Sequence, residues 1–322
     1  MKLRLTLASL LAFAATPAFA LDCEAGMRAF THTGGETCIP EKPERIVSLH
    51  DQSFTLSLLE LGAPVVGSMG RVDDAGNLYM RAVDLMLGLD FENSGITYVG
   101  AWEETDYEII ASLQPDLIIG WIDDAEYSDK HAAIAPTVYL ESDNAEPLAL
   151  ARATADAAGV LDAWEARLAV YRANIERAKF AAPGMVGATY SKIQGWDGNL
   201  EVYAGYGGLT MVLDDLGFER ASFGKAMADR GVEWGETVSA EVIPELEADY
   251  LFDTYTIAYG DTLADPDKRL NEVFPGWCDQ LSACKADRYI VLPREFSTPD
   301  AFTALNTLVQ LVSTHAARMP VE

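Results

Sequence analysis

The sequence predicts an α/β protein of two similar lobes, each a mainly parallel sheet with flanking helices, joined by one long helix. Two stretches that begin 133 positions apart carry similar patterns, EIIASLQPDLIIG from Glu108 and EVIPELEADYLFD from Glu241. Each pattern is typical of a short helix, a turn that ends at an aspartate, and a buried strand. An uninterrupted helical pattern runs between them from Asp162 to Ala181. Because small ligands often bind between two domains, the fold predicts a binding cleft.

The first 20 residues have the form of a secretory signal peptide. Lys2 and Arg4 give the charged start, an apolar core follows over residues 5–15, and Ala18-Phe19-Ala20, with a small residue at each end, forms a cleavage site. This core is shorter than the roughly 18 to 20 apolar residues that a membrane-spanning helix needs. We therefore expect a soluble periplasmic protein, cut after Ala20, whose mature chain begins at Leu21.

The charge of the chain excludes one class of partner. The sequence holds 50 acidic and 23 basic residues, a formal net charge of −27, and removal of Lys2 and Arg4 with the signal peptide brings it to −29. Such a surface repels phosphate backbones, and no basic run offsets it, so nucleic acid is excluded as a partner.

The four cysteines fall into two local pairs, Cys23 with Cys38 and Cys278 with Cys284. In an oxidising compartment each pair is expected to form a disulfide that closes a short loop. No Cys-x-x-Cys spacing supports a zinc site, so we expect no bound structural metal.

A polar lead-in over residues 21–43 precedes the first lobe, which we place at residues 44–143. A strand, a helix and a second strand open this lobe, and their order implies parallel pairing. Thr105 and Glu108 then have the spacing of a capping box at the start of the next helix. The expected strands are 45–50, 64–69, 116–121 and 137–140, with a helix at 54–61.

Two helices link the lobes over residues 144–182. The first is expected at 147–158 and ends at Gly159; the second spans 162–181 and presents one apolar face. Its length is about 30 Å at 1.5 Å per residue, enough to reach from one lobe to the other. A continuous helix resists bending, so we expect small closure motions.

The second lobe is placed at residues 183–322. A strand is expected to start at Met185, and a glycine-rich helix start follows at 205–208. Further strands are expected at 250–255 and 289–293, with helices near 265–274 and from Pro299 onward.

Over residues 43–316 the chain resembles the helical-backbone class, class III, of periplasmic substrate-binding proteins. The segments that carry the resemblance are PERIVS from Pro43, VGAW from Val99, the EIIASLQPDLII segment and the long helix. Members of this class serve ABC importers for ferric siderophores, ferric dicitrate and cobalamin. The resemblance implies the same fold and an inner-membrane ABC permease as partner.

In that class one glutamate on each lobe docks against arginines of the permease, and the matching positions here are Glu108 and Glu241. Two carboxylates on opposite lobes can report the spacing of the lobes through charge-assisted hydrogen bonds. The alternative is that each glutamate only caps its helix. Pro244 follows Glu241 closely, so the second helix is expected to begin later than the first.

Candidate ligand contacts are residues at the carboxyl ends of the expected strands, where parallel α/β sheets bind ligands. Trp102 also matches in position a cleft residue that touches ligand in the cobalamin-binding relatives. As alternatives, Trp102 is a core residue, and the arginines pair with Asp73, Asp74 or Glu295. Tyr203, Trp234 and Trp277 fall at positions to which the pattern gives no role, so they are left as core residues. The candidates are Arg71, Trp102, Trp121, Tyr190, Trp196, Tyr255 and Arg294, with His50, Asp51 and Tyr259 beside them.

This aromatic and arginine-rich set suits a large anionic ligand with chelated or aromatic parts. Few histidines are present, which disfavours capture of free metal ions. We expect a monomer without a cofactor that binds a ferric siderophore-type Fe(III) chelate. Haem, for which His50, Tyr190 or Tyr255 could be axial ligands, and cobalamin are the alternatives. Esterase, nucleotide and dinucleotide motifs are absent from the sequence, so an exported hydrolase or a ligand sensor is a remoter hypothesis.

Overall fold

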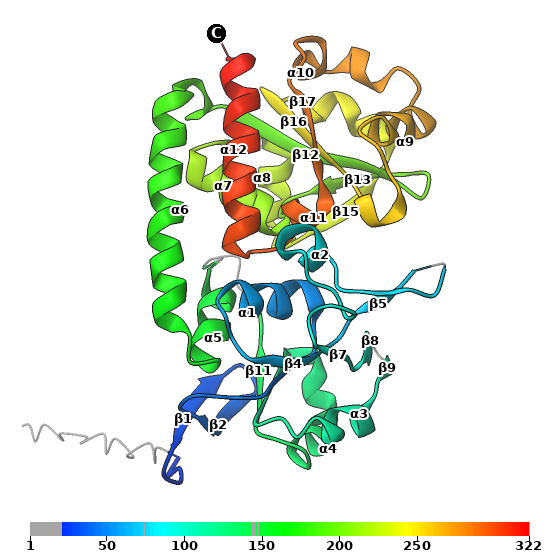
Figure 1. The fold of residues 1–322 in the computed structure, drawn as a ribbon. Coiled ribbons are helices and arrows are strands. Elements are labelled where there is room, and N and C mark those ends of the chain that lie inside the picture. The colour runs from blue at the N-terminus through cyan, green and yellow to red at the C-terminus, as the bar shows by residue number, and fades with distance from the viewer. Residues whose placement is uncertain (1–20, 74, 103, 143–145, 147, 322) are drawn as a thin grey trace, which may run out of the picture.

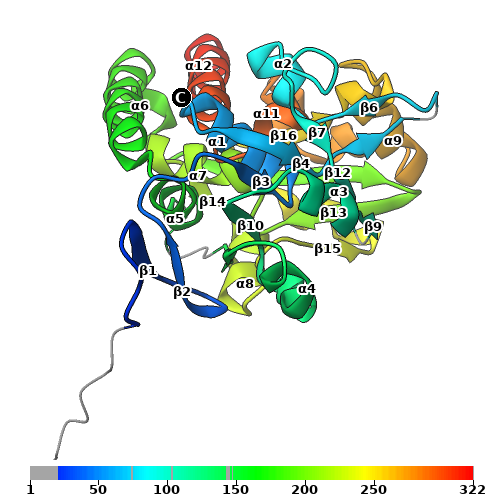
Figure 2. The ribbon, with the colours of Figure 1, turned by 60° about the horizontal axis from the view of Figure 1, so that its bottom comes forward.

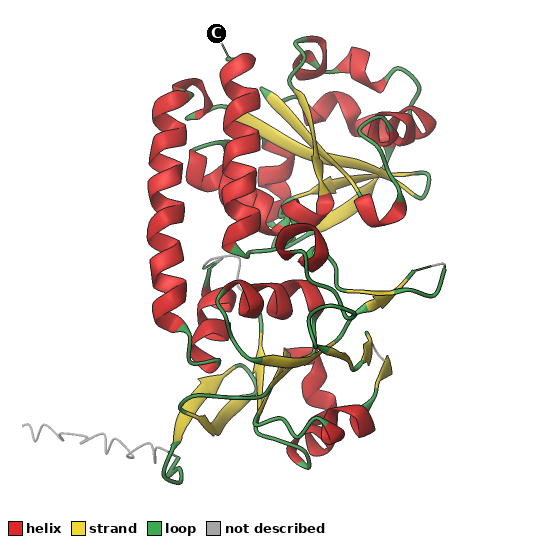
Figure 3. Ribbon diagram, viewed as in Figure 1, coloured by secondary structure: helices red, strands yellow, loops and turns green. Residues whose placement is uncertain are grey.

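The computed structural model describes residues 21–321, apart from 74, 103, 143–145 and 147. The predicted signal peptide therefore lies outside the described residues. Two sheets lie one above the other, and helix α6 runs beside both of them (Figure 1). Figure 3 shows helices packed around the sheet of each lobe. In the part of the chain that is described, no helix has the length and apolarity to cross a membrane.

The N-terminal sheet has five parallel strands in the order β11-β10-β3-β4-β7. Alternate residues of the interior strand β10 face opposite ways, as strand geometry requires. Leu117 and Ile119 pack with α1 and α5, whereas Ile118 packs with Ile110 of α3. The strands are β3 (Ile46–Ser48), β4 (Val65–Ser68), β7 (Thr97–Tyr98), β10 (Leu117–Trp121) and β11 (Thr137–Leu140).

Helices and short hairpins surround this sheet. A π-helical turn over Asp51–Thr55 leads directly into α1, so the helix expected at 54–61 starts earlier than its apolar pattern. The remaining elements are α1 (Leu56–Glu60), α2 (Val83–Leu87), α3 (Tyr107–Ser112), α4 (Ser128–Ala132) and the strand pairs β5 (Arg71–Val72) with β6 (Leu78–Tyr79) and β8 (Gly100–Ala101) with β9 (Glu104–Thr105).

The C-terminal sheet is mixed, with the order β15-β13-β12-β16-β17 and β14 paired to β12. Strands β12, β16 and β17 are parallel, whereas β13 and β15 are antiparallel to their neighbours. The strands are β12 (Thr189–Trp196), β13 (Asn199–Tyr203), β14 (Glu219–Arg220), β15 (Gly235–Val238), β16 (Tyr250–Tyr255) and β17 (Tyr289–Pro293).

One face of this sheet packs on α7 (Gly207–Leu216) and α12 (Phe302–Arg318). The opposite face packs on Met227 of α8 (Ser222–Asp229) and Leu270 of α9 (Asp265–Val273). Short helices α10 (Ser282–Lys285) and α11 (Arg294–Ser297) complete the lobe.

The two linking helices are α5 (Ala149–Ala157) and α6 (Leu161–Ala181). The predicted apolar face of α6 is confirmed, because Trp164, Leu168, Tyr171, Ile175 and Ala178 are its buried residues. This face packs on α12, and α6 also reaches the first lobe, where the Arg167 guanidinium donates to the carbonyl oxygen of Glu60 over 2.6 Å. The single helix therefore contacts both lobes.

The lead-in is more ordered than predicted. It forms a hairpin of β1 (Met27–His32) and β2 (Gly35–Pro40), which lies next to α5 (Figure 2). Its buried Phe30 and Ile39 join the core of the first lobe. Both predicted disulfides, Cys23–Cys38 and Cys278–Cys284, are present.

The predicted start of one strand and the predicted start of one helix were wrong. The strand expected at Met185 begins at Thr189, because Pro183–Met185 forms a 3-10 turn that extends the end of α6. The last helix begins at Phe302 rather than near Pro299.

Candidate functional site

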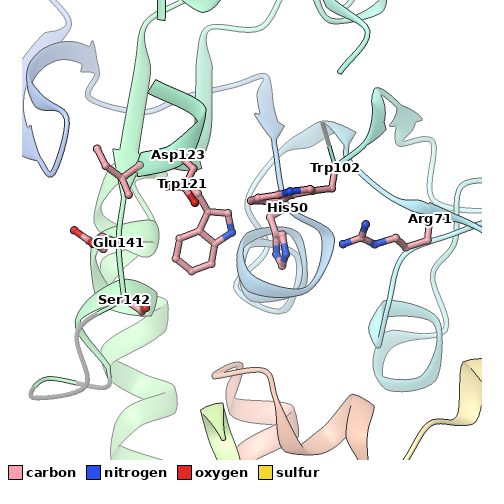
Figure 4. Close-up of a pocket in the computed structure, with 8 residues that line it drawn as sticks. His50, Arg71, Trp102, Trp121, Asp123, Glu141 and Ser142 are labelled. Carbon is pink, nitrogen blue, oxygen red and sulfur yellow. The ribbon is translucent and has the colours of Figure 1, made fainter. Parts of the chain in front are cut away.

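A cavity of about 560 Å³ lies at the carboxyl edge of the N-terminal sheet (Figure 4). Each lining segment follows a strand of that sheet, so the parallel arrangement brings side chains from distant parts of the chain together. His50 follows β3, Arg71 follows β4, Trp121 ends β10 and Glu141 follows β11. The lining is His50, Arg71, Trp102, Trp121, Ile122, Asp123, Glu141 and Ser142, all from the first lobe.

Aromatic rings form the centre of this pocket. The His50 ring centre lies 6.0 Å from Trp102 and 5.7 Å from Trp121, with interplanar angles of 90° and 80°. Phe54 supports Trp121 from the core, with ring centres 5.0 Å apart. Trp102 is 36% exposed, so the alternative hypothesis that it is a core residue is wrong. The pocket therefore offers flat apolar surface to a ligand.

Protein groups contact both ring nitrogens of His50. Its Nδ1 accepts from the Ser53 amide over 3.0 Å, and its Nε2 lies 3.0 Å from a guanidinium nitrogen of Arg81. Burial lowers the pKa of His50 to about 4; Asp51 opposes this shift, and Arg81 and Arg71 add to it. The imidazole is therefore neutral at neutral pH and contributes no charge to the pocket.

The charge of Arg81 is neutralised by Asp51. The Asp51 carboxylate is 1% exposed and accepts from the Arg81 amide over 2.9 Å and from its guanidinium over 2.6 and 3.0 Å. Burial alone would raise the pKa of Asp51, but the bonds and charge of Arg81 outweigh burial and keep that pKa below its ordinary value. This pair fixes the segment that carries His50.

Unlike Arg81, Arg71 has no hydrogen bond or ion pair among the described residues. Of its expected alternative partners, Asp73 accepts hydrogen bonds from the amides of Ala75 and Asn77, and Asp74 lies outside the described residues. Figure 4 shows Arg71 on one side of the aromatic rings, and Asp123 and Glu141 on the other. The pocket therefore has a cationic and an anionic side.

The candidate ligand contacts of the second lobe differ in how exposed their side chains are. Tyr190 is 3% exposed, with its ring 6.2 Å from Phe252 in the core, so it is not available to a ligand. It sits near the start of β12, because that strand begins later than predicted. Trp196, at the end of β12, is 41% exposed and has its ring 6.3 Å from Tyr259. Tyr255 ends β16 and is half-buried.

Arg294 opens α11, on a segment that touches the first lobe. The Gln52 amide nitrogen donates to the Thr298 hydroxyl over 2.7 Å, and the Thr298 amide donates to the Arg294 carbonyl over 3.1 Å. Gln52 is two residues from His50. The second-lobe segment that carries Arg294 therefore meets the first-lobe segment that carries His50.

Sequence reasoning missed an aromatic group on the second lobe. Tyr206 stacks on Trp234 with ring centres 4.9 Å apart, and Tyr203 meets both rings edge-on. Trp234 is 45% exposed, so its assignment to the core was wrong, whereas Trp277 is fully buried as predicted. One feature of the sequence could have indicated this aromatic group. Tyr203 and Tyr206 lie where a strand ends and a glycine-rich helix start follows.

A buried lysine lies under these tyrosines. The ammonium of Lys192 is 4.7 Å from the ring centre of Tyr203 and 4.4 Å from that of Tyr206. Burial lowers the pKa of Lys192 to about 8, against the opposing charge of Asp253, whose carboxylate is 3.4 Å away. Lys192 thus supports the aromatic group from behind.

A comparison with known protein families matches residues 81–293 to the family described as Periplasmic binding protein. The chain belongs to this family. Among curated relatives, this periplasmic binding protein is 28% identical over 235 residues to the iron(3+)-hydroxamate-binding protein FhuD of Bacillus subtilis, covering 70% of the chain and 69% of the relative. It is 29% identical over 240 residues to the probable siderophore-binding lipoprotein YfiY of the same organism, covering 73% and 70%.

Solved structures share the fold of this periplasmic binding protein. Staphylococcus aureus SirA complexed with staphyloferrin B matches with a TM-score of 0.71 and 20% identity, covering 90% of the chain and 97% of SirA. An FhuD fold-family component of a ferrichrome ABC transporter from Bacillus subtilis matches with a TM-score of 0.70 and 22% identity, covering 90% and 100%. The two-lobed α/β class predicted from the sequence is therefore confirmed.

The two glutamates of the duplicated motif occupy equivalent places in this periplasmic binding protein. Each is the second residue of a helical segment that precedes an interior strand of its sheet. These segments are α3 before β10 and a 3-10 helix, Ala240–Leu246, before β16. The amide of Glu108 donates to Asp106, and that of Glu241 donates to Ser239. Asp106 rather than Thr105 therefore caps α3, which corrects the predicted capping box. Both glutamates are exposed, and neither carboxylate has a bond or ion pair among the described residues.

Proposed function

We propose that this protein is the substrate-binding component of an ABC importer and captures a ferric siderophore-type chelate between its lobes. The observation that carries the proposal is the pocket of Trp102, Trp121 and the unneutralised Arg71 at the carboxyl edge of a parallel sheet. The names of the relatives, an iron(3+)-hydroxamate-binding protein and a probable siderophore-binding lipoprotein, support this ligand class. The proposed role is binding, without catalysis.

The chemistry of the pocket suits a ferric chelate. A cavity of about 560 Å³ accommodates a drug-sized ligand, and two indoles supply flat contact area to its organic framework. Arg71 can donate paired hydrogen bonds to the oxygen ligands of the iron. Across the cleft, Arg294, Trp196 and Tyr255 are proposed to complete the site from the second lobe.

Haem is less well supported than a chelate. A haem iron needs an axial histidine or tyrosine. Both ring nitrogens of His50 already face protein donors, and Tyr190 is buried. Two of the three axial ligands considered from the sequence are therefore occupied or inaccessible.

The delivery step rests on the two exposed glutamates. We propose that Glu108 and Glu241 dock on basic residues of the permease, one from each lobe, and that the protein acts as a periplasmic monomer after cleavage behind Ala20. A carboxylate that has no hydrogen bond within its own protein can form charge-assisted hydrogen bonds to a partner without first breaking existing bonds.

The proposal is tested by titrating the purified protein with candidate ligands while recording tryptophan fluorescence and melting temperature. The ligands are ferrichrome, ferrioxamine B, ferric citrate and ferric enterobactin, each beside its iron-free form, together with haemin and cyanocobalamin. At least one ferric chelate is expected to quench fluorescence and saturate. At 100 times its Kd it should add about 2.7 kcal/mol to the free energy of unfolding. Saturable binding of haemin or cyanocobalamin alone, with no response to any ferric chelate, would refute the proposal.

A further inference from the structure

A second cavity, of about 590 Å³, lies beside the main pocket in the first lobe. Trp102 and Asp123 line both cavities, so the two spaces adjoin at these side chains. The walls of this side cavity come from β9, α3, α4 and the 3-10 helix Ile122–Tyr127. None of the functions described above uses it.

The side cavity is strongly acidic. Glu104, Asp123, Asp124 and Glu126 line it, and none of them forms an ion pair within the described part of the chain. Asp124 is fixed in place, because its carboxylate accepts from the Trp121 amide over 2.7 Å. Among the described residues that line this cavity, Lys130 is the only basic one. Mutual repulsion between these carboxylates favours a cation in the space.

Aromatic rings in the same cavity already hold an ammonium group. The Nζ atom of Lys130 lies 4.6 Å from the ring centre of Tyr107 and 5.1 Å from that of Tyr127. Cations bind over aromatic faces through the ring quadrupole, and desolvation strengthens the contact. This contact is independent of the carboxylates and shows that the cavity accommodates a positively charged group.

We propose that the side cavity binds a cationic arm, an ammonium or guanidinium group, of the chelate whose metal-bearing part contacts Trp102 and Trp121. This inference rests on the proposed function and narrows its ligand class. Because Arg71 lies on the opposite side of the aromatic rings, the matching ligand is dipolar, with anionic oxygens near Arg71 and a cation beyond Asp123.

Lys130 takes the place of that cation in the free protein. Its side chain is exposed and has no carboxylate partner within 4.0 Å among the described residues, so it can leave the tyrosine rings for solvent. A ligand ammonium would then gain both the ring contacts and the surrounding carboxylates. Lys130 should therefore compete with the arm.

The test uses two probes that differ in a single charge. Ferrioxamine B carries a terminal ammonium, and its N-acetyl derivative has the same ferric trihydroxamate core with a neutral amide at that position. Affinities are measured by isothermal titration calorimetry on the full mature protein. We expect ferrioxamine B to bind about tenfold more tightly than the acetylated probe.

Variants locate the effect in the side cavity. In the double variant Glu104→Gln with Glu126→Gln, the affinity ratio between the probes should fall toward one, with little change for the acetylated probe. The control Glu165→Gln with Glu176→Gln removes the same charge from exposed positions of α6 and should keep the ratio. Lys130→Gln should raise the affinity for ferrioxamine B alone.

Several results would overturn the inference. One is that the wild-type protein binds the two probes with equal affinity. Another is that neither probe binds, while a ferric chelate without a cationic group does. Equal affinities together with transport lost in the Glu104 and Glu126 variant would assign the cavity to the permease instead. Failure of every ferric chelate contradicts the proposed function itself, so the two failures are distinguishable.

Discussion

The carboxylate of Glu60, on the first lobe, accepts a hydrogen bond over 2.8 Å from the amide of Phe302 at the start of α12. It also accepts from the amide and the hydroxyl of Thr303, each over 2.9 Å. Glu60 is 7% exposed. A residue of one lobe thus satisfies the free amides at the start of a helix of the other, where a negative charge is favoured by the helix dipole. This contact ties the lobes together beside α6.

Replacing Glu60 by glutamine should lower the free energy of unfolding by about 1 to 3 kcal/mol, because the amide NH₂ would face donors in place of an accepting oxygen. Urea denaturation followed by circular dichroism measures the change. Thr303→Val is the matched control: it removes only the hydroxyl donor and should cost about 1 kcal/mol or less. An unchanged stability for Glu60→Gln would show that the contact does not hold the lobes together.

Asp300, close to this contact, should make stability depend on pH. Burial raises the pKa of Asp300 to about 7 from an ordinary value of 3.8, and the charge of Glu60 adds to the rise. The folded state therefore binds more protons than the unfolded state between about pH 4 and 7, and stability falls as the pH rises through this range. In Asp300→Asn this part of the dependence should disappear, with higher stability than wild type at pH 8. Parallel stability curves from pH 4 to 8 would contradict the assignment.

The parts of the fold that were predicted closely are those with a continuous buried apolar pattern. The strands 137–140, 250–255 and 289–293 have the predicted bounds, and the buried face of α6 follows its spacing. The hairpin of residues 27–40 was missed because only one residue on each strand, Phe30 and Ile39, is buried. The turn signal for it was Gly34-Gly35.

The candidate site was predicted where strand ends were predicted correctly. Trp121 ends β10 as expected, and Arg71 and Trp102 follow their strands into the same pocket. Tyr190 was misplaced because the sequence does not show that the end of α6 continues into a 3-10 turn. Trp234 was assigned wrongly because its surroundings depend on the tertiary fold. Only the fold brings the segment of Trp234 against the segment of Tyr206.

Arg71→Gln should weaken binding of an anionic chelate such as ferric enterobactin by about tenfold or more, because Arg71 is the cation of the main pocket that no described group neutralises. Affinity for the uncharged complex ferrichrome should change much less. Fluorescence titrations at low and high salt measure both effects, and the salt dependence for the anionic chelate should become smaller in the variant. Arg172→Gln, on the exposed side of α6, is the charge-matched control. Equal losses for the two chelates would mean that Arg71 acts through shape rather than charge.

Replacing both Glu108 and Glu241 by alanine should abolish uptake of the bound chelate while its affinity in solution stays within about twofold. Both carboxylates are exposed and unpaired among the described residues, and neither lines the main pocket, so their removal disturbs neither the core nor the ligand contacts. Uptake is measured with radioactive iron in cells that lack the chromosomal copy, and affinity with the purified variant. The single variants should lose part of the uptake each, since each lobe would keep or lose its own contact. Glu165→Gln with Glu176→Gln controls for the change in net charge. A loss of solution affinity in the double alanine variant, or normal uptake by it, would contradict docking through these two residues.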